Sequence, residues 1–100
     1  MIKHIAMFSF LEESNGKTKY DNLKIAKNIM DELPSKIPQI KHWLTGINQS
    51  NSPKSFDIVI DSEFEPYDDL ETYKVHPAHL EFVDFLNTCR DKTHVVDFEF

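Results

Sequence analysis

The ten residues YKVHPAHLEF, from Tyr73 to Phe82, decide how the second half of the chain folds. A residue that precedes a proline is disfavoured in the α region, so a helix entering this stretch is expected to stop at His76. Proline suits the first position of a helix, which predicts that a new helix begins at Pro77 and runs to about Arg90. The stretch therefore predicts two short helices in succession, the first of them opening at Pro66.

The rest of the chain supplies four strands and one further helix. The helix is predicted from apolar residues at helical spacing, with Thr18 or Asp21 as its N-cap and Pro34 at its end. The strands are predicted from alternating polarity and β-forming residues, and Gly46 is expected to mark a bulge or a close approach in the second strand. The predicted ranges are Tyr20 to Leu33 for the helix, and Lys3 to Leu11, Ile40 to Ser50, Phe56 to Glu65 and Thr93 to Phe100 for the strands.

This order of elements, β-α-β-β-α-α-β, is that of a ferredoxin-like protomer of the α+β class, with an antiparallel sheet and the second helix broken in two. A chain of 100 residues has room for one core, so a single domain over residues 1–100 is expected. The first strand is unusual because both of its faces are largely apolar. A strand of this kind must be covered on both faces.

The composition argues against several classes of partner. Acidic residues outnumber Lys and Arg by 17 to 11, and no run of basic residues offers the charge that nucleic acid or an anionic membrane surface requires. No apolar run is long enough to cross a bilayer, and the first residues lack the pattern of a secretion signal. Cys89 is the only cysteine, so no intrachain disulfide can form. This suits a reducing compartment, and a cytoplasmic location is expected.

His79 is the strongest candidate for a catalytic residue, because of its position in the predicted helix. It falls in the first turn of the helix that begins at Pro77, where the positive end of the helix dipole disfavours the imidazolium and lowers the pKa. Phe82 and Leu86 lie three and seven residues beyond His79, so His79 begins an apolar stripe and is expected to face inward. A neutral imidazole in that position can act as a general base. His76 lies outside the stripe and is expected to cap the helix.

These residues suggest a pocket for a small molecule. His4 lies on the face of the first strand that is expected to meet the helices, and His79 is expected to face the sheet. An apolar pocket with a few polar groups is the usual form of a small-molecule site. The predicted lining residues are His4, Ala6, Phe8, Tyr73, His79 and Phe82.

The same residues also have a purely structural interpretation. A histidine on an apolar stripe is more often a hydrogen-bonded core residue than a catalyst, and a tyrosine there is more often a wall than an acid. His76 and His79 offer two nitrogens to a metal, but no cysteine or nearby acidic residue completes a set, so no metal is expected. Cys89 is expected to be inert packing in its helix, and the carboxylates of Phe56 to Glu65 to form a solvated face.

Four pieces of the chain together resemble the stress-responsive dimeric α/β-barrel family: KHIAMFSF, the GINQSNSP–FDIVIDSEFE hairpin, YKVHPAHLEF and the terminal VVDFEF. The resemblance runs from about Ile2 to Phe100, and its most specific part is a tyrosine followed by two residues and HPAH. It implies a ferredoxin-like protomer that pairs with a second copy through its sheet to form a closed barrel. A homodimer of this kind would cover the second apolar face of the first strand.

The resemblance also implies an activity. A plant polyketide cyclase of this family closes a linear polyketide without a cofactor, using a histidine and a tyrosine of such a segment. On that match His79 is the general base, Tyr73 positions or polarises a carbonyl, His4 lines the pocket, and no cofactor is needed. The cyclase has aromatic side chains on its first helix where this chain has Asn22 and Ala26, so its substrate does not carry over.

Three functions remain open at this point. The first is a homodimer that binds a small carbonyl-containing or aromatic molecule and performs cofactor-free acid–base chemistry on it, such as cyclisation or enolisation. The second is a non-catalytic stress-response or ligand-binding protein with the same barrel. The third is a barrel-type monooxygenase, for which no haem ligand or reactive aromatic group can be assigned in the sequence.

Overall fold

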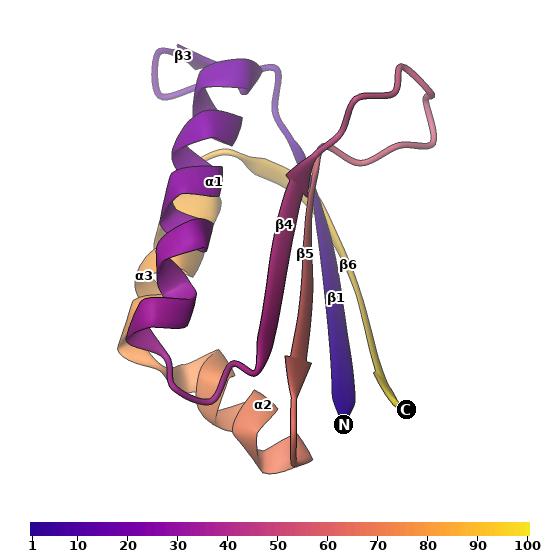
Figure 1. Cartoon of the computed structure of the whole chain (residues 1–100). Helices are drawn as coiled ribbons and strands as arrows, with labels where there is room; N and C mark the ends of the chain where they lie inside the picture. The colour runs from indigo at the N-terminus through magenta and orange to yellow at the C-terminus, as the bar shows by residue number, and fades with distance from the viewer.

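The computed structural model describes every residue from Met1 to Phe100. Four strands form one antiparallel sheet in the order β4-β5-β1-β6, and three helices lie on one side of it (Figure 1). The strands are β1 (Ile2–Phe10), β4 (His42–Ile47), β5 (Ile58–Phe64) and β6 (Arg90–Glu99), and the helices are α1 (Lys19–Lys36), α2 (Tyr67–Val75) and α3 (Pro77–Leu86). The predicted β-α-β-β-α-α-β order of the α+β class is therefore confirmed.

The core lies between the helices and the inner face of the sheet. Alternate residues of β1 and β5 point into it, and the register pairs Ala6 with Ile60 at its centre. The buried face of α1 follows its predicted stripe, and Thr18 caps the helix by accepting a hydrogen bond from the Asp21 amide. The core cluster comprises Ile2, Ala6, Phe8, Phe10, Leu23, Ala26, Met30, Leu33, Ile37, Ile58, Ile60, Phe64, Leu70, Tyr73, Phe82, Leu86 and Cys89.

The prediction that Pro34 ends the first helix is wrong, because α1 continues to Lys36. Proline removes one backbone donor, and in the last turn of a helix that loss affects a single hydrogen bond. The Ile37 amide still donates to the Leu33 carbonyl at 3.0 Å, and the Ile37 side chain is fully buried. Burial of Ile37 holds the turn that follows the proline in place.

The structure differs from the prediction in three other features. The segment before α1 contains a small hairpin, β2 (Glu13–Ser14) and β3 (Lys17–Thr18), where a loop was expected. Gly46 pairs regularly with Val59, so β4 has no bulge there. The helix α3 ends at Leu86, short of Arg90, and β6 already begins at Arg90. Cys89 consequently lies in the turn between them and not in the helix.

The outer face of the sheet carries apolar side chains that no helix covers. Met7, Leu44, Val96 and Phe98 are all exposed, and the register of β1 with β6 sets Ile5 beside Val96 on this face. Charged residues flank them: the Lys3 ammonium contacts the carboxylates of Asp61 and Glu63 at 2.9 and 2.8 Å.

The expectation that the carboxylates from Asp57 to Glu65 form a solvated face is thus wrong in part. Besides the two carboxylates that pair with Lys3, Asp57 just before the strand accepts a hydrogen bond from the Phe10 amide and pairs with Lys19. Asp57 thereby links the end of β1 to the start of α1.

Among the helices, none is both long and apolar enough to traverse a membrane.

Candidate functional site

The break between α2 and α3 sets the position of the candidate site. His76 adopts an extended conformation, with φ −62° and ψ 138°, and is both the last cap of α2 and the first cap of α3. Its Nδ1 accepts a hydrogen bond from the Ala78 amide at 3.1 Å, so the predicted capping role is confirmed. The cap fixes His79 in the first turn of α3.

One hydrogen bond determines which nitrogen of His79 is free. Its Nδ1 lies 2.9 Å from the carbonyl oxygen of Lys74. A carbonyl can only accept, so Nδ1 carries the proton and donates it. In the neutral ring the lone pair is then on Nε2, which is the atom that can accept a proton.

The surroundings of His79 keep that ring neutral. Partial burial lowers its pKa, and the nearby charges of His4, His76 and Lys74 add to this, whereas the hydrogen bond to the Lys74 carbonyl acts in the opposite direction. The predicted direction is confirmed. The helix dipole was the expected cause of the lowered pKa, whereas burial is the main cause in the structure.

Tyr73 packs directly against His79, with 4.4 Å between the ring centroids. Its ring also contacts Phe64 and Trp43, with centroids 5.1 and 6.1 Å away. The side chain is 1% exposed, and its hydroxyl has no hydrogen-bond partner within the chain. Burial raises the pKa of Tyr73, so the hydroxyl keeps its proton and is available as a donor.

His4 faces the same region from the sheet and is held by Asp97. Its Nδ1 lies 2.5 Å from the Asp97 carboxylate, and the register of β1 with β6 places the two residues opposite each other. The Lys74 ammonium lies 4.0 Å from the same carboxylate. Asp97 was not anticipated from the sequence, although the alternation that sets Val96 and Phe98 outward also turns Asp97 inward.

A cavity of about 390 Å³ lies between α3 and the inner face of β1 and β6. Its size is that of a small-ligand site. It opens to solvent beside the edge strand, because Val95, which lines it, is 52% exposed. All six residues predicted to line a pocket do line it: His4, Ala6, Phe8, Tyr73, His79 and Phe82. Four further lining residues were not anticipated from the sequence: Lys74 of α2, and Arg90, Thr93 and Val95 of β6.

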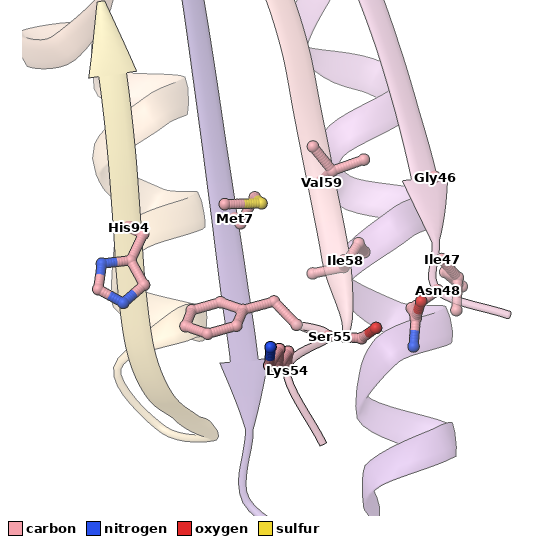
Figure 2. Close-up of a pocket in the computed structure, with 10 residues that line it drawn as sticks. Met7, Gly46, Ile47, Asn48, Lys54, Ser55, Ile58, Val59 and His94 are labelled. Carbon is pink, nitrogen blue, oxygen red and sulfur yellow. The ribbon is translucent and has the colours of Figure 1, made fainter. Parts of the chain in front are cut away.

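A second hollow, of about 670 Å³, lies on the opposite face of the sheet (Figure 2). Met7, Val59 and His94 line it from the strands, and Lys54 and Ser55 line it from the loop before β5 (Figure 2). Its only titratable side chains are Lys54 and His94. No carboxylate lines the hollow, and the Ser55 hydroxyl hydrogen-bonds to Ser50 and not to the imidazole. The hollow is therefore large enough for a small molecule, but its side chains do not form a catalytic arrangement.

The other reactive side chains lie outside the cavity. Cys89 is fully buried as a free thiol, and burial raises its pKa, which disfavours the reactive thiolate. His76 uses its Nδ1 as a cap. No group of three His, Cys, Asp or Glu residues is arranged to hold a metal ion.

A family model described as Stress responsive A/B Barrel Domain matches residues 2–100. The chain belongs to this family. Olivetolic acid cyclase from Cannabis sativa is 23% identical over 97 residues, which cover 97% of this chain and 94% of that protein. The stress-response A/B barrel domain-containing protein HS1 from Arabidopsis thaliana is 25% identical over 99 residues, covering 98% and 88%.

A solved structure supports the fold independently. A dimeric protein of unknown function with a ferredoxin-like fold, from Bacteroides fragilis, superimposes with a TM-score of 0.83 at 26% identity and covers 99% of this chain and 95% of its own. The family membership and the ferredoxin-like fold that the sequence predicted are thus confirmed. The roles of the individual cavity residues stay predictions.

Proposed function

We propose that this protein is a homodimer in which each protomer binds a small carbonyl compound and catalyses a cofactor-free proton transfer on it, such as enolisation or ring closure. The observation that supports the proposal best is the hydrogen bond from His79 Nδ1 to the Lys74 carbonyl. It leaves a lone pair on Nε2 of a ring that burial keeps neutral, at the wall of an apolar cavity.

The proton transfer would proceed in two steps. His79 Nε2 removes a proton from the carbon next to the substrate carbonyl, and the electron pair of the C–H bond moves onto the carbonyl oxygen. The Tyr73 hydroxyl donates a hydrogen bond to the enolate oxygen that forms. In enolisation, the enolate carbon then takes the proton back from the His79 imidazolium. In ring closure, the enolate carbon attacks a second carbonyl of the same substrate molecule, and the alkoxide that forms takes that proton.

His4 and Asp97 would hold the substrate from the opposite wall. The Asp97 carboxylate accepts a hydrogen bond from the Nδ1–H of His4. This bond fixes the orientation of the His4 ring and turns its Nε2 away from the carboxylate. A second imidazole in a fixed orientation can hydrogen-bond to a polar group of the bound ligand. In this proposal His79 acts as the base and His4 as a binding residue.

The apolar outer face of the sheet supports the homodimer. Leu44, Val96 and Phe98 expose between 44% and 60% of their surface, in a protein that carries them on one uncovered sheet. Several exposed apolar side chains on one uncovered sheet face are typical of a protein–protein interface. The dimeric Bacteroides fragilis neighbour shares the fold, so pairing through this face is the arrangement we propose for the chain.

A non-catalytic ligand-binding protein is the second candidate, and one observation favours it. Tyr73 is almost completely enclosed, so its hydroxyl would reach a substrate only where the cavity touches its ring. A protein of this kind would bind the same ligands in the same cavity. It would not exchange protons with them.

Hydrogen–deuterium exchange separates these two candidates. We expect the wild-type protein to accelerate exchange at carbon 2 of a 3-oxoacyl N-acetylcysteamine thioester in D₂O, followed by proton NMR. His79→Gln should reduce the rate by roughly 10²- to 10⁴-fold, the range of general-base catalysis. His42→Gln, which changes an exposed histidine of β4 outside the cavity, is the matched control and should leave it unchanged. A His79→Gln protein as fast as wild type would eliminate the catalytic role.

A further inference from the structure

The cavity has two polar ends separated by an apolar middle. One end holds His4, Tyr73 and His79, and the register pairs His4 with Asp97 there. Four residues further along the strands, Phe8 lies opposite Thr93. Strands advance about 3.3 Å per residue, so the His4–Asp97 pair and the Phe8–Thr93 pair are roughly 13 Å apart along the strands. The wall between them is formed by Ala6, Ile60, Phe82, Val83, Leu86 and Val95.

Arg90 lies beyond Thr93, at the end of the cavity away from the histidines. Its Nη2 donates to the Asn87 side-chain oxygen at 2.6 Å, and its Nη1 lies 3.4 Å from the Thr93 hydroxyl. A guanidinium has five N–H donors, so these contacts leave three of them without a partner in the chain. Arg90 is half-buried, at the foot of β6.

The charge of Arg90 is not balanced by an acidic side chain. None of the ion pairs in the protein includes it, in a chain whose acidic residues outnumber the basic ones. Lys74, the cation at the other end of the cavity, differs in this respect. Its ammonium lies 3.5 Å from Glu71 and 4.0 Å from Asp97. An anion that enters the cavity therefore meets an uncompensated cation only at the Arg90 end.

We propose that Arg90 and Thr93 form a binding subsite for a carboxylate, and that the ligand of this cavity is a medium-chain oxo acid. Its carboxylate pairs with the free guanidinium edge of Arg90, its apolar chain lies against Phe8 and Phe82, and its carbonyl reaches His79. An extended chain advances about 3.5 Å for every three bonds, so about eleven bonds, or roughly twelve atoms, span the two ends. The position of the carbonyl rests on the proposed function, whereas the carboxylate subsite stands without it.

Arg90 also has a structural interpretation. Asn87 is the C-cap of α3, and a cation near a helix C-terminus is stabilising. That role needs only a positive charge and one hydrogen bond to Asn87. A bidentate contact with a carboxylate needs the planar fork of the guanidinium, which lysine lacks.

Binding of decanoate, measured by isothermal titration calorimetry on the full chain, tests the subsite. We expect wild-type protein to bind decanoate and to bind methyl decanoate, which is uncharged, at least tenfold more weakly. Arg90→Gln should weaken decanoate binding at least tenfold and leave the methyl ester unaffected. Lys92→Gln removes the same charge from an exposed residue outside the cavity. It should change the dissociation constants of decanoate and of methyl decanoate by no more than twofold.

Arg90→Lys separates the structural role from binding. It should keep the thermal stability of wild type and still lose most of the decanoate affinity, because charge is retained and the fork is lost. Decanoate that binds wild type and Arg90→Gln equally, or no better than its methyl ester, overturns the proposal. Failure of wild type to bind decanoate at all does so too. Decyl phosphate in place of decanoate shows whether the subsite accepts any oxyanion, and binding of the phosphate alone would overturn the assignment to a carboxylate.

The orientation of the ligand gives an independent result. Intermolecular nuclear Overhauser effects should connect carbon 2 of decanoate to the Thr93 methyl group, and the tail to the His79 ring. The reverse orientation would contradict the subsite. The preference for decanoate over methyl decanoate should persist in His79→Gln even where that variant no longer exchanges protons, so that failure of the proposed catalysis and failure of the subsite are seen in different experiments.

Discussion

The imidazole Nδ1 of His79 donates to the backbone carbonyl of Lys74, 2.9 Å away in the last turn of the preceding helix. The helix break at His76 makes this contact possible, because it frees the last carbonyls of α2 while α3 begins beside them. The local fold thus selects the tautomer of the histidine. A base on Nε2 follows from backbone geometry and not from a neighbouring carboxylate.

The stability of the protein should depend on pH through His79. Its folded-state pKa lies below the ordinary value of 6.5, so between those two values the unfolded chain binds more protons at this site than the folded protein. The stabilisation is complete above about pH 6.5 and is lost as the pH falls through the lowered pKa. Urea unfolding of wild type and His79→Gln between pH 5 and 8 should show a steeper acid loss for wild type. Parallel curves would show that His79 is not the group responsible.

Tyr73→Phe should separate catalysis from stability. The hydroxyl has no partner in the chain, so its removal costs no hydrogen bond and relieves the desolvation of a buried polar group, leaving stability unchanged or raised by about 1 kcal/mol. The exchange rate should fall roughly 10²-fold if the hydroxyl stabilises an enolate. Thermal denaturation and the NMR exchange assay measure the two effects. A variant that loses stability and keeps its rate would assign Tyr73 to the wall of the cavity.

Asp97→Asn should disturb His4 without unfolding the protein. The amide oxygen can still accept from His4 Nδ1, but the bond loses the charge that shortens it to 2.5 Å. We expect the downfield imidazole N–H signal of His4 to disappear and the exchange rate to fall about tenfold, as for other positioning residues. Glu99→Gln, at the next inward position of β6, carries no ion pair and serves as control. An unchanged His4 signal in Asp97→Asn would contradict the pairing.

Val96→Asp should dissociate the proposed homodimer. Val96 lies on the outer face of the edge strand β6, opposite Ile5, and is 51% exposed. A carboxylate there would have to be desolvated in the interface. Leu80 is 49% exposed on α3, so Leu80→Asp introduces the same charge at an equally exposed apolar position on the helical side. Light scattering after size-exclusion chromatography should give a monomer for Val96→Asp and a dimer for wild type and Leu80→Asp. Dissociation by the Leu80 change alone would place the interface on the helices.

The parts of the fold that local rules control were predictable from the sequence. Period-two alternation set the faces of β1 and β5, and the His76–Pro77 pair located the helix break to the residue. The end of α1 was not predictable, because burial of Ile37 in tertiary contacts outweighs the local effect of Pro34.

The same division holds for the candidate site. The inward direction of His79 follows from its spacing to the apolar residues of its own helix. The partnership of His4 with Asp97 depends on which strands pair and in what register, and these residues are 93 positions apart in the chain. Arg90 was assigned to a helix that in fact ends at Leu86, which removed it from consideration as a residue of the cavity.

The ionisation of His79 tests the central claim most directly. Nitrogen-15 NMR of the wild-type protein across pH 4 to 9, with assignment of the ring by comparison with His79→Gln, reports both the tautomer and the pKa. The account predicts a neutral ring with its proton on Nδ1 and a pKa below 6.5. A pKa above that value, or a neutral ring protonated on Nε2, would contradict a base at this position.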